Sequence, residues 1–109
     1  MTDLPIINED DRRILYDCAQ GNFKSAKAVI AKDAIPVGDH YHLNKDEVFF
    51  LLSGKFIEMI NGTERLENVA APYKVFVPHG TYHKFTLEPG SVLLGVATEL
   101  FDPKDEIKC

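Results

Sequence analysis

The chain has 109 residues, of which 45% are hydrophobic and 27% charged, and its net charge is −5. This length gives one domain with a single core, and the composition excludes a disordered or low-complexity chain. Because the charge is negative and no lysine or arginine cluster is present, we expect neither nucleic acid nor an anionic membrane as a partner.

The compartment follows from the cysteines and from the hydropathy pattern. Cys18 and Cys109 are too few and too far apart to make a disulfide framework. No apolar run approaches the roughly 20 residues of a membrane helix, and no basic segment followed by an apolar one stands at the start. We therefore expect a cytoplasmic protein.

The first third of the chain predicts short, irregular elements. Residues 1–11 form an arm or a short edge strand followed by an acidic, solvated loop, and residues 12–18 form a first strand. Residues 24–32 have the intrinsic propensity of a helix. Pro36 and Gly38 form a turn that leads into the next strand.

A histidine pair is the first chemical signal. Alternate side chains of a strand point the same way, so His40 and His42 present two imidazoles to one side of a sheet. Asn44 and Asp46 are turn formers, and a short loop or bulge there turns Glu47 back to the same side. A carboxylate is thus expected to join the two imidazoles.

The strand that follows is apolar on both of its faces. Val48, Phe50 and Leu52 point one way, and Phe49 and Leu51 point the other. The barrel interior covers one side, and a second sheet or a partner subunit covers the other. We expect a homodimer, because a chain this short has little else to cover such a face.

The rest of the chain has the spacing of an antiparallel barrel or sandwich. Asn61-Gly62 is the strongest short-range hairpin signal and joins strands over residues 55–60 and 63–69. Further strands are expected over residues 73–77, 82–87 and 92–100. The charged residues 102–109 are expected to form a loose tail or a final helical turn.

A tight turn at Pro78-His79-Gly80 delivers His83 on the strand that follows it. A histidine pair alone is more often structural than ligating, but a third histidine and Glu47 at fixed spacings predict a metal site. His79 itself is expected on the loop or rim.

These residues resemble the cupins, and in particular a small single-domain metal-binding cupin of the RmlC-like jelly-roll type. The first cupin motif is His-x-His, three or four residues, Glu, six residues and Gly. His40-x-His42, Glu47 and Gly54 fit it. Gly38 lies one residue before the pair, whereas the motif places its opening glycine further away.

The centre of the second cupin motif, Pro-x-Gly-x-x-His, matches Pro78, Gly80 and His83. The flanks differ, because Pro72 stands in place of the opening glycine and Leu87 in place of the closing asparagine. These differences concern loop geometry and leave the expected ligands unchanged.

The resemblance implies an all-β fold, an antiparallel double-stranded β-helix or jelly-roll barrel in one domain. It assigns residues 1–22 to an N-terminal arm and first strand, residues 23–101 to the cupin barrel and residues 102–109 to a charged tail. It also implies that residues 24–32 are a barrel strand in spite of their helical propensity. It also implies one divalent metal ion, Fe, Mn, Ni, Zn or Co. The expected ligands are His40, His42, Glu47 and His83.

Three nitrogens and one carboxylate leave open coordination positions, which suits catalysis better than a closed structural site. Lys45 lies on the loop at the barrel mouth, either solvated or placed for an anionic substrate. The expected pocket wall is apolar and consists of Phe49, Leu51, Phe85 and Leu87.

Two enzyme chemistries share such a site, which would act on a small oxygen-rich substrate. With iron the resemblance implies a dioxygenase, and with a redox-inert ion an isomerase or epimerase of sugars or keto acids. Some small sugar isomerases of the wider family use a histidine acid/base pair without metal. The alternative is a non-catalytic module that binds metal and a small ligand, and fold resemblance alone does not choose among these.

Overall fold

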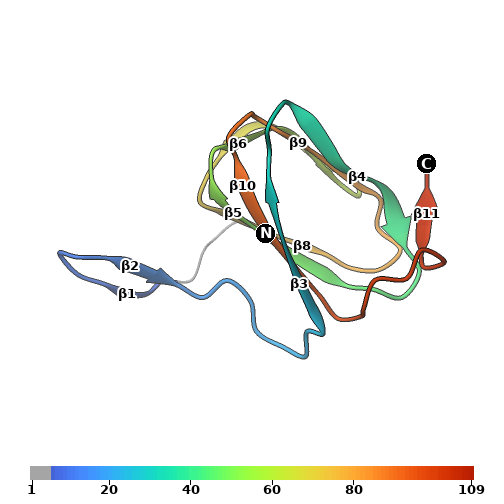
Figure 1. Ribbon diagram of the computed structural model, residues 1–109, viewed down its shortest axis with the longest axis horizontal. Helices are drawn as coiled ribbons and strands as arrows, with labels where there is room; N and C mark the ends of the chain where they lie inside the picture. The colour runs from blue at the N-terminus through green and yellow to red at the C-terminus, as the bar shows by residue number, and fades with distance from the viewer. Residues whose placement is uncertain (1–5) are drawn as a thin grey trace.

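The computed structural model describes residues 6–109, so the first five residues of the expected arm lie outside it. The described residues form eleven β-strands and no α-helix (Figure 1). The strands are β1 (Ile6–Glu9), β2 (Ile14–Tyr16), β3 (Ser25–Ile30), β4 (Ile35–His42), β5 (Glu47–Ser53), β6 (Lys55–Asn61), β7 (Glu64–Ala70), β8 (Tyr73–Val77), β9 (His83–Leu87), β10 (Val92–Ala97) and β11 (Glu106–Lys108).

Two antiparallel sheets form the barrel (Figure 1). One has four strands in the order β3-β10-β5-β8, and the other has five in the order β11-β4-β9-β6-β7. Non-consecutive strands are neighbours in both sheets, as in a jelly roll. The expected fold class, an all-β antiparallel jelly-roll barrel in one domain, is confirmed. No helix in residues 6–109 is long and apolar enough to cross a membrane.

The core lies between the two sheets. Phe56 and Phe85 are fully buried, and their ring centroids lie 5.1 Å apart. Phe85 also meets the ring of Phe49 at 5.1 Å, edge to face. Such aromatic contacts add about 0.5–1.5 kcal/mol each to the stabilisation from burial. Apolar burial in this core therefore holds the two sheets together.

The N-terminal segments contain two short strands, as expected, and these strands pair with each other. β1 and β2 pair in a separate two-stranded sheet that stands away from the barrel (Figure 1). The segment at the end of β2 returns to the barrel, where the Tyr16 ring lies 6.0 Å from that of Phe50. Phe50 is only 2% exposed, whereas Leu52 remains 47% exposed. The chain itself thus covers part of the face that was expected to need a second sheet or a partner.

Two local expectations have clear outcomes. The segment with helical propensity is the strand β3, because its backbone pairs with β10 along its whole length, and tertiary pairing overrides propensity. The hairpin between β6 and β7 also forms, but Asn61 pairs with Glu64, so its turn is Gly62-Thr63, one residue later than expected. Gly62 supplies the positive φ, 63°.

Two segments that border the histidines, the start of β4 and the C-terminal β11, differ from the expected elements. Residues 35–38, expected as a turn, belong to β4, and the irregularity is a bulge at Gly38 and Asp39. The charged end of the chain is not a loose tail or helical turn, because β11 pairs antiparallel with β4. In that register Glu106 lies opposite His42.

Candidate metal centre

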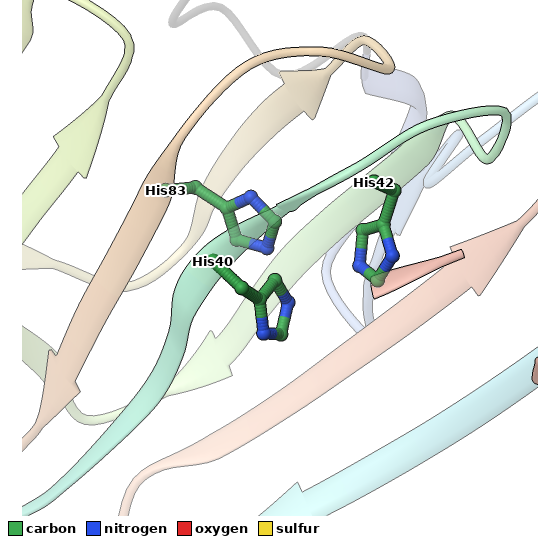
Figure 2. A group of neighbouring side chains, drawn as sticks. All are labelled: His40, His42 and His83. Atoms are coloured by element: carbon green, nitrogen blue, oxygen red, sulfur yellow. The ribbon is translucent and has the colours of Figure 1, made fainter. Parts of the chain in front are cut away.

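Three imidazoles meet inside one end of the barrel, which we call the mouth. His40 and His42 come from β4 and His83 from β9, and one ligand nitrogen of each lies within 4.8 Å of the others (Figure 2). The ring centroid of His40 lies 4.6 Å from that of His42 and 4.7 Å from that of His83. The structure thus brings together the three histidines that the motifs singled out.

The bulge in β4 explains why these rings converge. Gly38 and Asp39 have φ of 97° and 68°, and the register shifts there so that His40 lies opposite His83. A Cβ atom at Gly38 would stand 2.6 Å from the carbonyl oxygen of His83. Only glycine permits this approach of the two strands. The short loop expected after the histidine pair is present at residues 43–46 and brings Glu47 to the histidines, whereas the bulge at Gly38 and Asp39 was not expected.

Glu47, the first residue of β5, completes the arrangement. Its Oε1 lies 3.2 Å from Nε2 of His42 and 3.6 Å from Nε2 of His83. The same oxygen is buried and has no hydrogen-bond partner within residues 6–109. Burial raises the pKa of Glu47, against the opposing effect of Lys45. A buried carboxylate oxygen without a partner, facing two imidazole nitrogens, fits a shared cation.

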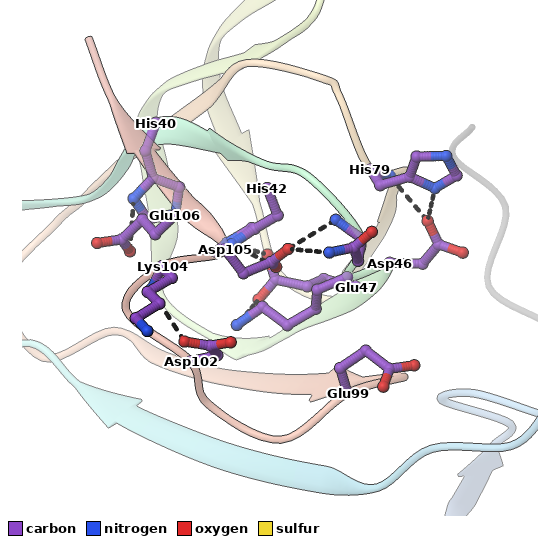
Figure 3. Close-up of polar contacts among 12 residues, drawn as sticks. His40, His42, Asp46, Glu47, His79, Glu99, Asp102, Lys104, Asp105 and Glu106 are labelled. Carbon is purple, nitrogen blue, oxygen red and sulfur yellow. Dashed lines mark hydrogen bonds and ion pairs between the residues drawn. The ribbon is translucent and has the colours of Figure 1, made fainter.

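The Nδ1 atoms of His40 and His42 point the other way, toward carboxylate oxygens (Figure 3). Nδ1 of His40 lies 3.0 Å from Glu106 Oε1, and Nδ1 of His42 lies 3.5 Å from Asp105 Oδ2. Both contacts have ion-pair distances, but neither Nδ1 makes a hydrogen bond. Nδ1 of His83 is 3.2 Å from the Thr81 carbonyl oxygen. Nε2 of His42 and of His83 is thereby left toward Glu47.

The electrostatics keep these imidazoles neutral. Burial, helped by the positive charge of Lys45, lowers the pKa of His42 to about 4. Burial also lowers the pKa of His83 to about 4, although the Thr81 carbonyl acts in the opposite direction. Burial lowers the pKa of His40 as well. Neutral imidazoles are the form that binds metal, so the site is ready for an ion at neutral pH.

A cavity of about 160 Å³ opens beside the histidines. It is lined by Ser25, Lys27, Val29, Val37, His40, His42, Lys45, Glu47, Phe49, His83, Leu93, Gly95, Ala97, Phe101 and Glu106. Of the expected wall, Phe49 lines it, whereas Leu51, Phe85 and Leu87 belong to the core. The wall is therefore apolar on the sheet side, as expected, but built mainly from other residues.

Two loop residues can now be placed. Lys45 is 8% exposed and its Nζ lies 3.8 Å from Glu47 Oε2, so the solvated interpretation is wrong. His79 is exposed on the rim, as expected, and its Nδ1 lies 2.8 Å from Oδ1 of Asp46. Its backbone N–H donates to the same oxygen at 2.7 Å.

Sequence reasoning missed the residues that reach the site from outside the motifs. Asp105 and Glu106 approach the histidines, while Lys27 and Phe101 stand at the cavity, where Nζ of Lys27 lies 4.7 Å from the Phe101 ring centroid. They follow no motif spacing. The available signal was the neighbouring pair of acidic residues in the tail.

Comparisons with known proteins support the fold. No protein-family model matches the sequence, and no curated protein matches it. Among solved structures, the 3′-monoepimerase ChmJ from Streptomyces bikiniensis, in complex with dTDP-quinovose, matches with a TM-score of 0.83 at 13% identity. The match covers 98% of this chain and 67% of that chain. The TDP-quinovose 3,4-ketoisomerase WlaRB from Campylobacter jejuni matches with a TM-score of 0.79 at 22% identity. This match covers 97% of this chain and 88% of that chain.

The capsular polysaccharide assembling protein CapF from Staphylococcus aureus matches at 0.66 and 25% identity, over 97% of this chain. The match covers 32% of CapF, so this chain corresponds to about a third of that protein. The structural neighbours include cupin-fold sugar ketoisomerases and epimerases. Their likeness establishes the fold, and this chain is a jelly-roll barrel of the cupin type.

Proposed function

We propose that the chain is a metal-dependent isomerase or epimerase of a small oxygen-rich substrate. One divalent ion, Fe, Mn, Ni, Zn or Co, would be held by His40, His42, His83 and Glu47. The observation that carries this proposal is the buried Oε1 of Glu47, which has no hydrogen-bond partner and faces Nε2 of two histidines. Imidazole and carboxylate donors suit this series of ions.

The pKa values favour ligation over an acid/base role for the histidines. An efficient general base has a pKa near the working pH. His42 and His83, with pKa values of about 4, are weak bases at neutral pH but good neutral ligands. A histidine base acting without metal is thus the less favoured mechanism.

Isomerisation suits the pocket and the neighbours. An isomerase or epimerase removes a proton beside a carbonyl group and returns a proton to the substrate, so no oxidant is consumed. A bound divalent ion would supply the polarisation of that carbonyl. Several neighbours are named as sugar 3,4-ketoisomerases, and one as a 3′-monoepimerase. These names support the isomerase choice over the dioxygenase.

The cavity limits what reacts. Its volume of about 160 Å³ resembles that of a cavity which encloses one benzene molecule, so it takes a small keto acid or the reacting part of a sugar ring. Lys45 is buried beside the ligands and Lys27 lies at the cavity, so both can hold an anionic group of the substrate. The apolar wall keeps water away and strengthens these interactions.

The test follows deuterium uptake from heavy water into a panel of small keto acids and keto sugars, with dioxygen consumption measured in parallel. The samples compared are metal-loaded wild type, metal-free wild type and Glu47→Gln. The control is Glu99→Gln, which alters an exposed carboxylate. Metal-dependent exchange that Glu47→Gln loses and Glu99→Gln keeps supports the proposal. Dioxygen consumption would replace it with a dioxygenase.

Two other outcomes would also overturn the proposal. Saturable ligand binding without turnover would make the protein a non-catalytic binding module. Full activity of the metal-free protein would leave an acid/base mechanism with His83 or His42 as the base.

We also propose a homodimer in the cytoplasm. Leu52 and Phe76 remain 47% and 42% exposed on neighbouring strands of the four-stranded sheet, and both cysteines are free. A second copy would cover this apolar surface. Light scattering at micromolar concentration should give twice the chain mass, and a monomeric mass would contradict the dimer.

A further inference from the structure

The C-terminal segment brings two carboxylates to the back of the histidine pair. β11 pairs with β4, and this pairing places Glu106 Oε1 3.0 Å from Nδ1 of His40. Asp105, just before β11, places Oδ2 3.5 Å from Nδ1 of His42. Both Nδ1 atoms are shielded from solvent. Each Nδ1 therefore faces a carboxylate oxygen and not water.

A neutral imidazole carries one proton, on Nδ1 or on Nε2. If the proton were on Nε2, the lone pair of Nδ1 would face an ionised carboxylate, and the two would repel each other. With the proton on Nδ1, the N–H faces the carboxylate and the Nε2 lone pair is free. We propose that Asp105 and Glu106 are positioning residues, which hold the protons of His42 and His40 on Nδ1 and leave both Nε2 atoms to the site.

Asp105 acts more strongly than Glu106 because its two oxygens have separate partners. Its Oδ1 accepts the backbone N–H of Asn44 at 2.7 Å and the side-chain amide of Asn44 at 3.0 Å. This clamp leaves Oδ2 toward His42 (Figure 3). Glu106 has no such clamp within the described residues, and its second oxygen meets Nζ of Lys108 at 3.3 Å.

Because of this clamp, Asp105→Asn is expected to change the tautomer of His42 in a defined way. Asn44 offers two N–H donors to one oxygen, so the new amide must place its oxygen there and its NH₂ group toward His42. Nδ1 of His42 must then accept, and its proton moves to Nε2. Asparagine in place of an aspartate beside a catalytic histidine is known to give the wrong tautomer. In Glu106→Gln the amide can turn, so we expect a smaller change at His40.

The experiment reads the tautomers of metal-free protein from the nitrogen chemical shifts of the imidazoles, at about pH 8, where imidazoles with pKa values at or below ~6.5 are neutral. His42 should carry its proton on Nδ1 in wild type and on Nε2 in Asp105→Asn. The matched control is Asp102→Asn in the same loop, where Asp102 accepts the backbone N–H of Lys104. It should leave His42 unchanged.

Two internal checks keep the test decisive. His83 takes its tautomer from the Thr81 carbonyl, so an unchanged His83 signal shows that a variant has kept the barrel mouth. Zn²⁺ titration should give dissociation constants about 10- to 100-fold weaker for Asp105→Asn, because outer partners of ligating histidines have effects of this size.

Wild-type His42 protonated on Nε2, or an unchanged His42 tautomer in Asp105→Asn, would overturn the inference. The affinity change rests on the proposed function, whereas the tautomers do not. A wild type that binds no Zn²⁺ but shows the expected tautomers would therefore refute the metal site alone.

Discussion

The two ends of the barrel use the same strands for opposite purposes. On β6 and β9, Phe56 pairs with Leu87 at one end, and Asn61 pairs with His83 at the other. Phe56, Leu87 and His83 are all almost fully buried. Burial of the apolar pair stabilises the fold, whereas burial of the imidazole disfavours its charged form and lowers its pKa.

The unsatisfied polar groups show the same contrast. In the part of the chain that the structure describes, four of the five buried side-chain atoms without hydrogen bonds lie at the histidine end: Nδ1 of His40, Nδ1 of His42, Oε1 of Glu47 and Oδ1 of Asn61. The fifth, the hydroxyl of Tyr73, lies beside Phe56 at the other end. Such groups cost stability unless something pairs with them. The comparison teaches that the far end is stabilised by apolar burial, whereas the mouth buries polar groups at a cost in stability.

Phe56→Ala should give the largest loss of stability. Its ring is fully buried, so its removal should lower the free energy of unfolding by about 3–5 kcal/mol. The neighbouring Ile57 is 37% exposed, and Ile57→Ala is the control, with a much smaller loss. Urea unfolding measures both, and metal content per folded chain should stay unchanged. Equal losses from the two variants would refute the division between the ends.

Acidification of metal-free protein should give the second-largest loss of stability. His42 and His83 have pKa values of about 4 when folded and near ~6.5 when unfolded. The unfolded chain therefore binds more protons between these values, and stability falls as pH decreases from about 6.5 toward 4. The raised pKa of Glu47 acts in the opposite direction and offsets part of this loss.

Urea midpoints at several pH values test this pH dependence. A flat or rising stability on acidification through that window would show that the two imidazoles are not buried in neutral form.

Gly38→Ala should have the smallest of these effects, with Gly80→Ala as its control. Both glycines have positive φ, so alanine costs about 1–2 kcal/mol at either position. A Cβ atom at Gly38 also meets the His83 carbonyl, whereas one at Gly80 meets nothing within 4 Å. Gly38→Ala should therefore destabilise more in urea and weaken Zn²⁺ binding. Equal behaviour of the two variants would show that the bulge does not position the histidines.

Sequence alone was sufficient for the parts that depend on local spacing. The motifs placed His40, His42 and His83 on strands that meet, and turn residues marked the short antiparallel strands. Sequence alone was insufficient where segments that are distant in the chain pair with each other. No local signal shows that Glu106 lies beside His40, because that contact depends on the pairing of β11 with β4.

Two errors have the same physical origin. The bulge at Gly38 was missed because a glycine before a strand is equally consistent with a turn, and only the approach to His83 distinguishes them. The outer face of β5 was assigned to a second sheet or a partner, but Tyr16, far away in sequence, covers Phe50. Burial by a remote segment has no periodicity that the sequence could show.

The central claim is tested most directly by elemental analysis of protein purified without chelators. Wild type should contain about one divalent ion per chain, and His42→Ala should contain none while its circular dichroism stays unchanged. His79→Ala, which alters the exposed rim histidine, is the control and should keep its metal. Full metal in folded His42→Ala would contradict the account.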